Sequence, residues 1–273
     1  MSKTGLCLLI LALVLGLVGC AKKEEVATTE ETSAPPAPTI TPGEMVLIPA
    51  GEFTLGVDDK DTTAYPQQKV NLPAFWIDKH EATNAEFLDF SIKTGYVGEG
   101  AQEGRTWRTF FTPDKANFPV VYITWKDALT YCESLGKRLP TELEWEKAAR
   151  GVEGRKYPWG AKWENQKSNT YEAGYTQPVA IGQFEGDVSP FGVHDMLGNV
   201  QEWTGSWYKP YKGSTKTDPY FGESHRVVRG ISSRIYGSRA ALWARSAWEP
   251  GSLYDFGCRC AKDATPEEAA QAK

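Results

Sequence analysis

Residues 136–151 read Gly-Lys-Arg-Leu-Pro-Thr-Glu-Leu-Glu-Trp-Glu-Lys-Ala-Ala-Arg-Gly and predict a short helix. Thr141 is placed to cap this helix, and Glu144, three residues later, completes a capping box. Gly151 follows the last helical residue, as is common at helix ends. The buried side is expected to carry four apolar residues, Leu143, Trp145, Ala148 and Ala149.

Similar signals predict the elements on either side of this helix. Thr124 and Asp127 form a second capping box ahead of a helix over 127–135. Residues 84–93 have apolar side chains at helical spacing, and Gly95 closes that helix. Strands are expected at five places, namely 45–49, 51–56, 75–78, 119–123 and 226–229. A tight turn should join the first two strands.

Regular signals become sparse after Gly160, although aromatic residues and glycine remain frequent. The whole chain contains ten Trp and 26 Gly. Large rings at this density favour coil that is packed and ordered. Glu142, Glu144 and Glu146 are expected to cap the helix and pair at its surface, because residues two apart on a helix do not share a face. His194 is expected to be a packed loop residue.

Composition and charge narrow the class of protein. The chain is 24% charged and 41% hydrophobic, as in ordinary globular proteins. Its formal net charge is -5 and no long basic run is present, so nucleic acid is not expected as a partner. Residues 44–264 are enough for one large domain with its own core, or for two small ones.

The N-terminal segment has the order of an export signal, with Lys3 followed by the apolar run Leu6–Val18. Residues 17–20, Leu-Val-Gly-Cys, resemble a lipobox, so residues 1–19 are predicted to be removed and Cys20 to be lipidated. An ordinary signal peptide is the alternative. Several acyl chains on Cys20 would anchor the protein stably to a membrane. Ala21 favours the outer membrane where a cell envelope has two membranes.

Polar segments flank the predicted domain. Residues 20–43 are rich in Glu, Thr, Ala and Pro and are expected to form a disordered tether. Residues 265–273 form a polar tail that is expected to fray.

Four segments together resemble the formylglycine-generating enzyme, or sulfatase-modifying factor, family. They are residues 45–53, 118–128, 136–160 and 196–203, and residues 256–261 resemble the family's last strand. The resemblance implies one domain over residues 44–264 with an α+β fold of the C-type-lectin-like kind. Such a fold has a small antiparallel sheet, two main helices and much ordered coil.

The resemblance also implies a structural calcium site. Its ligands would be Asp195, the Gly198 carbonyl, the Val200 carbonyl and Glu202. Calcium needs several oxygen ligands, which carboxylates and free carbonyls of one bent loop supply. In the alternative, the two carboxylates only cap and pair within a packed loop. A second family calcium site would begin at Asn169 and Thr170, but the Asp that should follow is absent before Pro178.

The cysteine count allows one disulfide in an exported domain. Apart from Cys20, the chain beyond the signal contains Cys132, Cys258 and Cys260. The resemblance implies a disulfide between Cys132 and Cys260. Cys258 could compete with Cys260, because residues two apart on a strand face the same side.

The sequence departs from the family at the residues that carry the enzymatic activity. The family's oxidases bind copper(I) through two cysteines that lie shortly after an Arg-Val-x-x-Gly-Gly-Ser motif, and thiolates suit that soft ion. The matching segment here, residues 226–240, contains no cysteine. No cysteine lies between Cys132 and Cys258. A copper site is therefore not expected, and enzymatic activity remains open.

We therefore expect an envelope lipoprotein whose domain binds, scaffolds or matures another molecule without oxidising it. Its ligand would be a peptide, a glycan or an envelope protein, held in the groove where the family's oxidases hold their substrate. The groove would be rimmed by Ser232, Ser233, Arg234, Tyr236, Trp243 and Arg245. The alternative is a formylglycine-generating oxidase that acts on sulfatases or another exported protein through different ligands.

Overall fold

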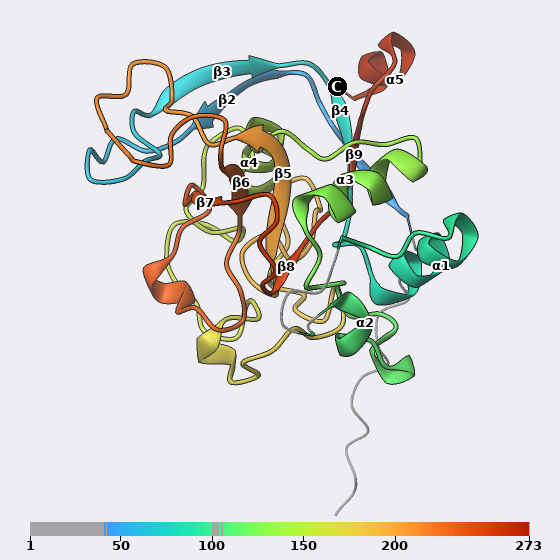
Figure 1. The fold of residues 1–273 in the computed structure, drawn as a ribbon. Helices are drawn as coiled ribbons and strands as arrows, with labels where there is room; N and C mark the ends of the chain where they lie inside the picture. The colour runs from blue at the N-terminus through green and yellow to red at the C-terminus, as the bar shows by residue number, and fades with distance from the viewer. Residues whose placement is uncertain (1–40, 42, 100–103, 105, 273) are drawn as a thin grey trace, which may run out of the picture. The chain divides into compact units, whose positions relative to one another are not determined.

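The computed structural model describes residues 41–272 except 42, 100–103 and 105 (Figure 1). The predicted signal peptide, Cys20 and nearly all of the tether lie outside the described residues. No helix in the described ranges is long and apolar enough to cross a membrane.

The strands of the described residues form three small sheets. The first has the order β1-β4-β9, the second pairs β2 with β3, and the third has the order β7-β6-β5-β8. The strands are β1 (Met45–Ile48), β2 (Gly51–Leu55), β3 (Gln68–Leu72), β4 (Phe75–Asp78), β5 (Gln201–Trp207), β6 (Arg226–Arg229), β7 (Ser246–Trp248), β8 (Phe256–Gly257) and β9 (Ala261–Asp263). All neighbours are antiparallel except β5 and β8.

The helices predicted after Thr124 and Thr141 begin at these caps. The helices are α1 (Asn84–Thr94), α2 (Trp107–Phe110), α3 (Trp125–Ser134), α4 (Glu142–Arg150) and α5 (Pro266–Gln271), with short 3-10 turns η2 (Pro113–Lys115), η3 (Tyr171–Ala173) and η4 (Gly237–Arg239). Thr83, Thr124 and Thr141 each form a capping box with the acidic residue three positions later. Gly95 ends α1 in the left-handed conformation, at φ 72°.

Only Pro49 and Ala50 separate β1 from β2, although the two strands belong to different sheets. Two local predictions are wrong. Residues 119–123 form only an isolated bridge, because Tyr122 has a φ of 58° and breaks the extended chain. The C-terminal tail contains α5, which Thr265 and Glu268 cap with a further capping box.

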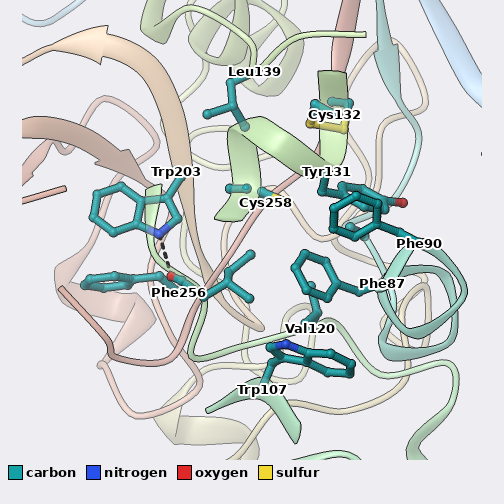
Figure 2. Packing of buried hydrophobic residues seen from close by; sticks show 14 of the residues in the cluster. Phe87, Phe90, Trp107, Val120, Tyr131, Cys132, Leu139, Trp203, Phe256 and Cys258 are labelled. Carbon is teal, nitrogen blue, oxygen red and sulfur yellow. Dashed lines mark hydrogen bonds between the residues drawn. A yellow bond between two sulfur atoms is a disulfide. The ribbon is translucent and has the colours of Figure 1, made fainter. Parts of the chain in front are cut away.

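The core around the disulfide joins distant parts of the chain (Figure 2). Cys132 of α3 is bonded to Cys260, which lies just before β9, and both cysteines are fully buried. Phe87, Trp107 and Tyr131 pack in the same cluster. The Trp203 indole N–H donates to the Ile123 carbonyl at 3.0 Å, which fixes β5 against the segment that precedes α3.

The long coil after α4 is packed, as its aromatic content predicts. Trp145, Tyr157 and Leu242 belong to one buried cluster, with Trp159 and Trp163 packed against it. The prediction of an α+β architecture with much ordered coil is confirmed.

Candidate functional site

The segment from β6 to β7 is held on α4 by a buried network of charges. Arg229 of β6 contacts Glu146 at 2.6 Å and Glu142 at 3.1 Å. Arg245 donates to Glu142 at 2.8 Å. Glu142 and Glu146 are buried, so the prediction that they pair at the helix surface is wrong. The network fixes both ends of the segment that matches the family's active-site region.

The six residues predicted to rim one groove do not line a single surface. Ser232 and Ser233 are buried. Arg234 lines one cleft, whereas Trp243 and Arg245 line another. The side chain of Arg245 is only 1% exposed, because it pairs with Glu142. The six residues therefore do not share one groove, since Ser232 and Ser233 are buried in the core while Arg234 and Tyr236 are exposed.

The first cleft, which we call the Phe110 cleft, has a volume of about 90 Å³. Phe110 and Tyr122 stack in parallel along it, with ring centroids 3.9 Å apart. The other residues that line it are Asn84, Lys115, Phe118, Pro119, Val121, Gln177, Pro178, Arg234 and Asp255. This space suits a single apolar side chain of a bound molecule.

Two oxygen atoms of this cleft are buried without a hydrogen-bond partner among the described residues. They are Asn84 Oδ1 and Asp255 Oδ2. The Asn84 amide nitrogen donates to the Lys115 carbonyl at 3.0 Å, which fixes the orientation of the amide. Buried acceptors are normally satisfied, so these two oxygens are unusual among the residues that the structure describes. No sequence signal pointed to these two residues, which lie 171 positions apart in the chain (255 − 84).

The second cleft, beside Trp243, is larger and more open, with a volume of about 570 Å³. Asp59, Asp61 and Asp218 line it together with Lys156 and Arg239. Carboxylates and cations are mixed along its walls. The cleft therefore has no charge preference that would identify a ligand.

The predicted calcium loop is sharply bent. Asp195 and Asn199 adopt positive φ values of 57° and 68°, which Asp and Asn tolerate better than most residues. Gly182 N–H donates to Asp195 Oδ2 at 2.7 Å. Glu202 forms a two-pronged ion pair with Arg259, with Oε1 at 2.7 Å and Oε2 at 2.8 Å.

Two acidic residues that sequence reasoning missed, Glu81 and Asp187, are buried near this loop. Burial, followed by the charges of Asp195 and Glu202, raises the pKa of Glu81 well above its ordinary value. Burial and the Asp195 charge raise the pKa of Asp187 to about 7. Glu81 Oε2 has no hydrogen-bond partner among the described residues. These four carboxyl groups outnumber the single guanidinium of buried Arg259, which pairs with Glu202.

An oxygen-coordinated cation would favour the charged forms of these carboxyl groups, which burial alone disfavours. In the described part of the chain, no three side chains of His, Cys, Asp or Glu are arranged to hold a metal by themselves. A cation here would therefore depend on backbone carbonyls such as those of Gly198 and Val200. In the sequence Glu81 follows His80, and no motif indicates that it could be a ligand.

Asn169 and Thr170 lie close to the same loop. The Asn169 side chain donates to Asn199 Oδ1 at 2.9 Å, and Asn199 in turn donates to Glu81 at 3.1 Å. Asn169 Oδ1 is buried without a partner among the described residues. Thr170 Oγ1 donates to Glu172 at 2.8 Å. Both residues therefore lie near the predicted calcium loop. Of the two, only Asn169 has a buried side-chain oxygen without a hydrogen-bond partner among the described residues.

The cysteines leave a single thiol in the described chain. The predicted Cys132–Cys260 disulfide is confirmed, with the Cα atoms 5.5 Å apart. Cys258 is free and fully buried. Burial and the nearby Glu202 raise the pKa of the Cys258 thiol well above its ordinary value, which disfavours the reactive thiolate.

Comparisons with known proteins agree with the motifs. The profile of the sulfatase-modifying factor enzyme 1-like domain matches residues 30–264. The formylglycine-generating enzyme of Bos taurus is 31% identical over 287 residues, which cover 82% of this chain and 76% of that protein. The inactive C-alpha-formylglycine-generating enzyme 2 of Mus musculus is 31% identical over 275 residues, which cover 81% of this chain and 86% of that protein.

A solved structure has the same fold. PvdO from Pseudomonas aeruginosa superposes with a TM-score of 0.64 at 24% identity, over 81% of this chain and 94% of that one. The fold expected from the motifs is therefore confirmed. The chain belongs to the family of sulfatase-modifying factor enzyme 1-like domains.

Proposed function

We propose that this chain is an exported, lipid-anchored protein that binds a polypeptide segment in the Phe110 cleft and does not oxidise it. The absence of oxidation in this proposal rests on how the cysteines of the described residues are paired. The family's oxidases need two thiolates on copper(I). Here Cys132 and Cys260 are joined in a disulfide, and Cys258 is alone and buried.

The walls of the Phe110 cleft support a polypeptide as the ligand. The stacked pair of Phe110 and Tyr122 offers apolar contact, and Asn84 and Asp255 offer acceptors for N–H groups. Pro178 and Arg234 also line the cleft. A few polar groups placed on apolar walls are typical of ligand pockets. A scaffold or maturation role would use the same contact.

Photo-crosslinking tests this cleft directly. With p-benzoylphenylalanine in place of Phe110, the full chain in cells should form a discrete adduct with a polypeptide. The same group in place of Tyr220, which is 50% exposed and outside the cleft, should not form that adduct. Asp255→Ala should weaken the adduct at position 110. Adducts of equal yield at both positions, or none at position 110, would exclude the cleft as the binding site.

The lipid anchor is the second part of this proposal. Its support is the order of Lys3, the apolar run and Cys20 in the sequence. Cys20→Ser should move the protein from the membrane fraction to the soluble fraction. A variant that stays in the membrane fraction would contradict lipidation at Cys20.

We also propose that the buried carboxylates near Asp195 hold a structural calcium ion. A ligand that binds only the folded state adds about 2.7 kcal/mol at a concentration 100 times its Kd. Millimolar calcium should therefore raise the melting temperature relative to excess chelator. Asp195→Asn should fold without calcium and lose most of this shift, because it keeps the acceptor for Gly182 N–H but removes the charge. No calcium-dependent shift in the unmodified chain would contradict the proposal.

A further inference from the structure

Two hydrogen-bonded loops beside the Phe110 cleft expose an unusual group of side chains. Tyr171 and Tyr236 are each 43% exposed, and Ile235 is 40% exposed. Arg234 and Arg239 are exposed in the same stretch. We call these five residues the Tyr/Arg surface. Contiguous exposed apolar groups of this kind often mark interaction sites.

The contacts between the two loops bring these side chains together. Tyr171 N–H donates to the Ile235 carbonyl at 3.0 Å. The rings of Tyr171 and Tyr236 lie 4.4 Å apart, and the Arg239 guanidinium lies 5.2 Å from the centre of the Tyr236 ring. Arg234 donates to the Thr176 carbonyl at 3.3 Å. The Tyr/Arg surface is therefore one patch.

The Glu172 side chain joins the two loops through hydrogen bonds. Its carboxylate accepts hydrogen bonds from Gly237 N–H at 2.9 Å, Ser238 N–H at 3.0 Å and Thr170 Oγ1 at 2.8 Å. Although partial burial opposes ionisation, the donors at Ser238 and Gly237 hold the pKa of Glu172 at about 2. The side chain therefore stays charged and bonded at neutral pH.

The exposed loop packs closely against the Trp163 ring at Gly237. A Cβ at this position would lie 2.3 Å from the Trp163 ring, so no side chain fits there without a shift. A surface held in this way loses little conformational entropy when a partner binds. The aromatic residues of the Tyr/Arg surface are thus pre-organised for contact.

The two arginines give the surface its charge. The arginines that form ion pairs among the described residues are others, namely Arg138, Arg150, Arg155, Arg229, Arg245 and Arg259. The one carboxylate of these loops, Glu172, already accepts three hydrogen bonds. The chain as a whole carries a formal net charge of -5, so two arginines on one surface, neither in an ion pair among the described residues, depart from its overall charge.

We infer that the Tyr/Arg surface docks an acidic polypeptide segment of a partner protein. Tyr171 and Tyr236 act as the apolar anchors, while Arg234 and Arg239 pair with carboxylates of the partner. Tyr and Arg are the residue types that most often carry the energy of protein interfaces, and complementary charge sets the choice of partner. The inference extends the proposed function to a second contact, and it does not require an occupied Phe110 cleft.

The probe is a random copolymer of glutamate and tyrosine, compared with polyglutamate and with heparin. Binding is measured with the full chain in detergent. The copolymer should bind more tightly than polyglutamate of equal length, because the tyrosines add apolar contact. Arg234→Glu with Arg239→Glu should lower the affinity about tenfold or more. Lys126→Glu with Lys212→Glu makes the same change in net charge at exposed positions elsewhere, and should change the affinity less than about twofold.

Glu172→Gln distinguishes an effect of loop order on binding from an effect of net charge. Loss of a negative charge would strengthen the binding of an acidic probe if charge alone mattered. We expect weaker binding instead, because the two loops lose the charged acceptor of the Gly237 and Ser238 N–H groups. Glu172 is thus a positioning residue in this account.

Three results would overturn the inference. They are no binding of the copolymer, an equal loss in both double variants, and binding of heparin alone, which would make the surface a site for an anionic glycan. A failed crosslink at position 110 with copolymer binding that still depends on Arg234 and Arg239 would reject the cleft and keep this surface.

Discussion

Glu146→Ala is expected to lower the free energy of unfolding by about 3–5 kcal/mol, because it removes the counter-ion of buried Arg150 and one of the two counter-ions of buried Arg229. Glu146 is fully buried, contacts Arg229 at 2.6 Å and Arg150 of its own helix, and accepts from Gly56 N–H at 2.7 Å. Although burial opposes ionisation, Arg229 and Arg150 hold the pKa of Glu146 below its ordinary value. This stabilisation is present above the unfolded pKa, near 4.5, and is lost as the pH falls further.

Urea unfolding followed by circular dichroism measures this effect as a fall in the transition midpoint. Glu133→Ala is the matched control, since Glu133 is an exposed glutamate on the neighbouring helix α3. The control should change the free energy of unfolding by no more than about 0.5 kcal/mol. A loss below about 1 kcal/mol for Glu146→Ala would mean that the network does not hold β6 on α4.

The second large effect is expected from the disulfide. Replacing Cys132 and Cys260 together with Ala should cost about 4–5 kcal/mol, because the bond closes a loop with a sequence separation of 128 residues. Such a loss is comparable to the whole stability of many domains. The double variant should therefore unfold at much lower urea concentration or fail to accumulate.

Cys258→Ala is the control for the disulfide variant. Cys258 lies in the same buried cluster but forms no disulfide (Figure 2). Removal of its sulfur should cost about 1 kcal/mol, as expected for a small cavity. Similar losses in the two variants would indicate that the Cys132–Cys260 bond adds little beyond its packing.

Local features of the fold were predictable from the sequence. The capping boxes at Thr124 and Thr141 depend on residues three positions apart, so a short window contains the whole signal. The strand Arg226–Arg229 was also predicted at its observed limits. The disulfide was predictable because the family motifs fixed the partner of Cys132.

Long-range charge pairing was not predictable. Glu146 and Arg229 are 83 positions apart, and Glu142 and Arg245 are 103 positions apart. Alternating glutamates on a short helix look like surface residues when their partners are unknown. The cationic partners come from β6 and the coil after it, which only the folded chain brings to α4.

The Phe110 cleft was missed for a similar reason. Its residues come from α1, α2, the segment before α3, the coil near Pro178 and the segment before β8. The positive φ of Tyr122 turns that ring onto Phe110, whereas the sequence predicted a regular strand. Only Arg234 of the predicted groove lines this cleft.

The central claim is that this member of the family binds without oxidising. The most direct test incubates the purified chain with a cysteine-containing sulfatase peptide, copper(I) and oxygen, beside an active formylglycine-generating enzyme. Mass spectrometry follows the conversion of the peptide cysteine to formylglycine. We predict an unchanged peptide with this chain and full conversion by the active enzyme. Conversion by this chain would contradict the account, and Cys258, its single free thiol among the described residues, would then be the first residue to replace.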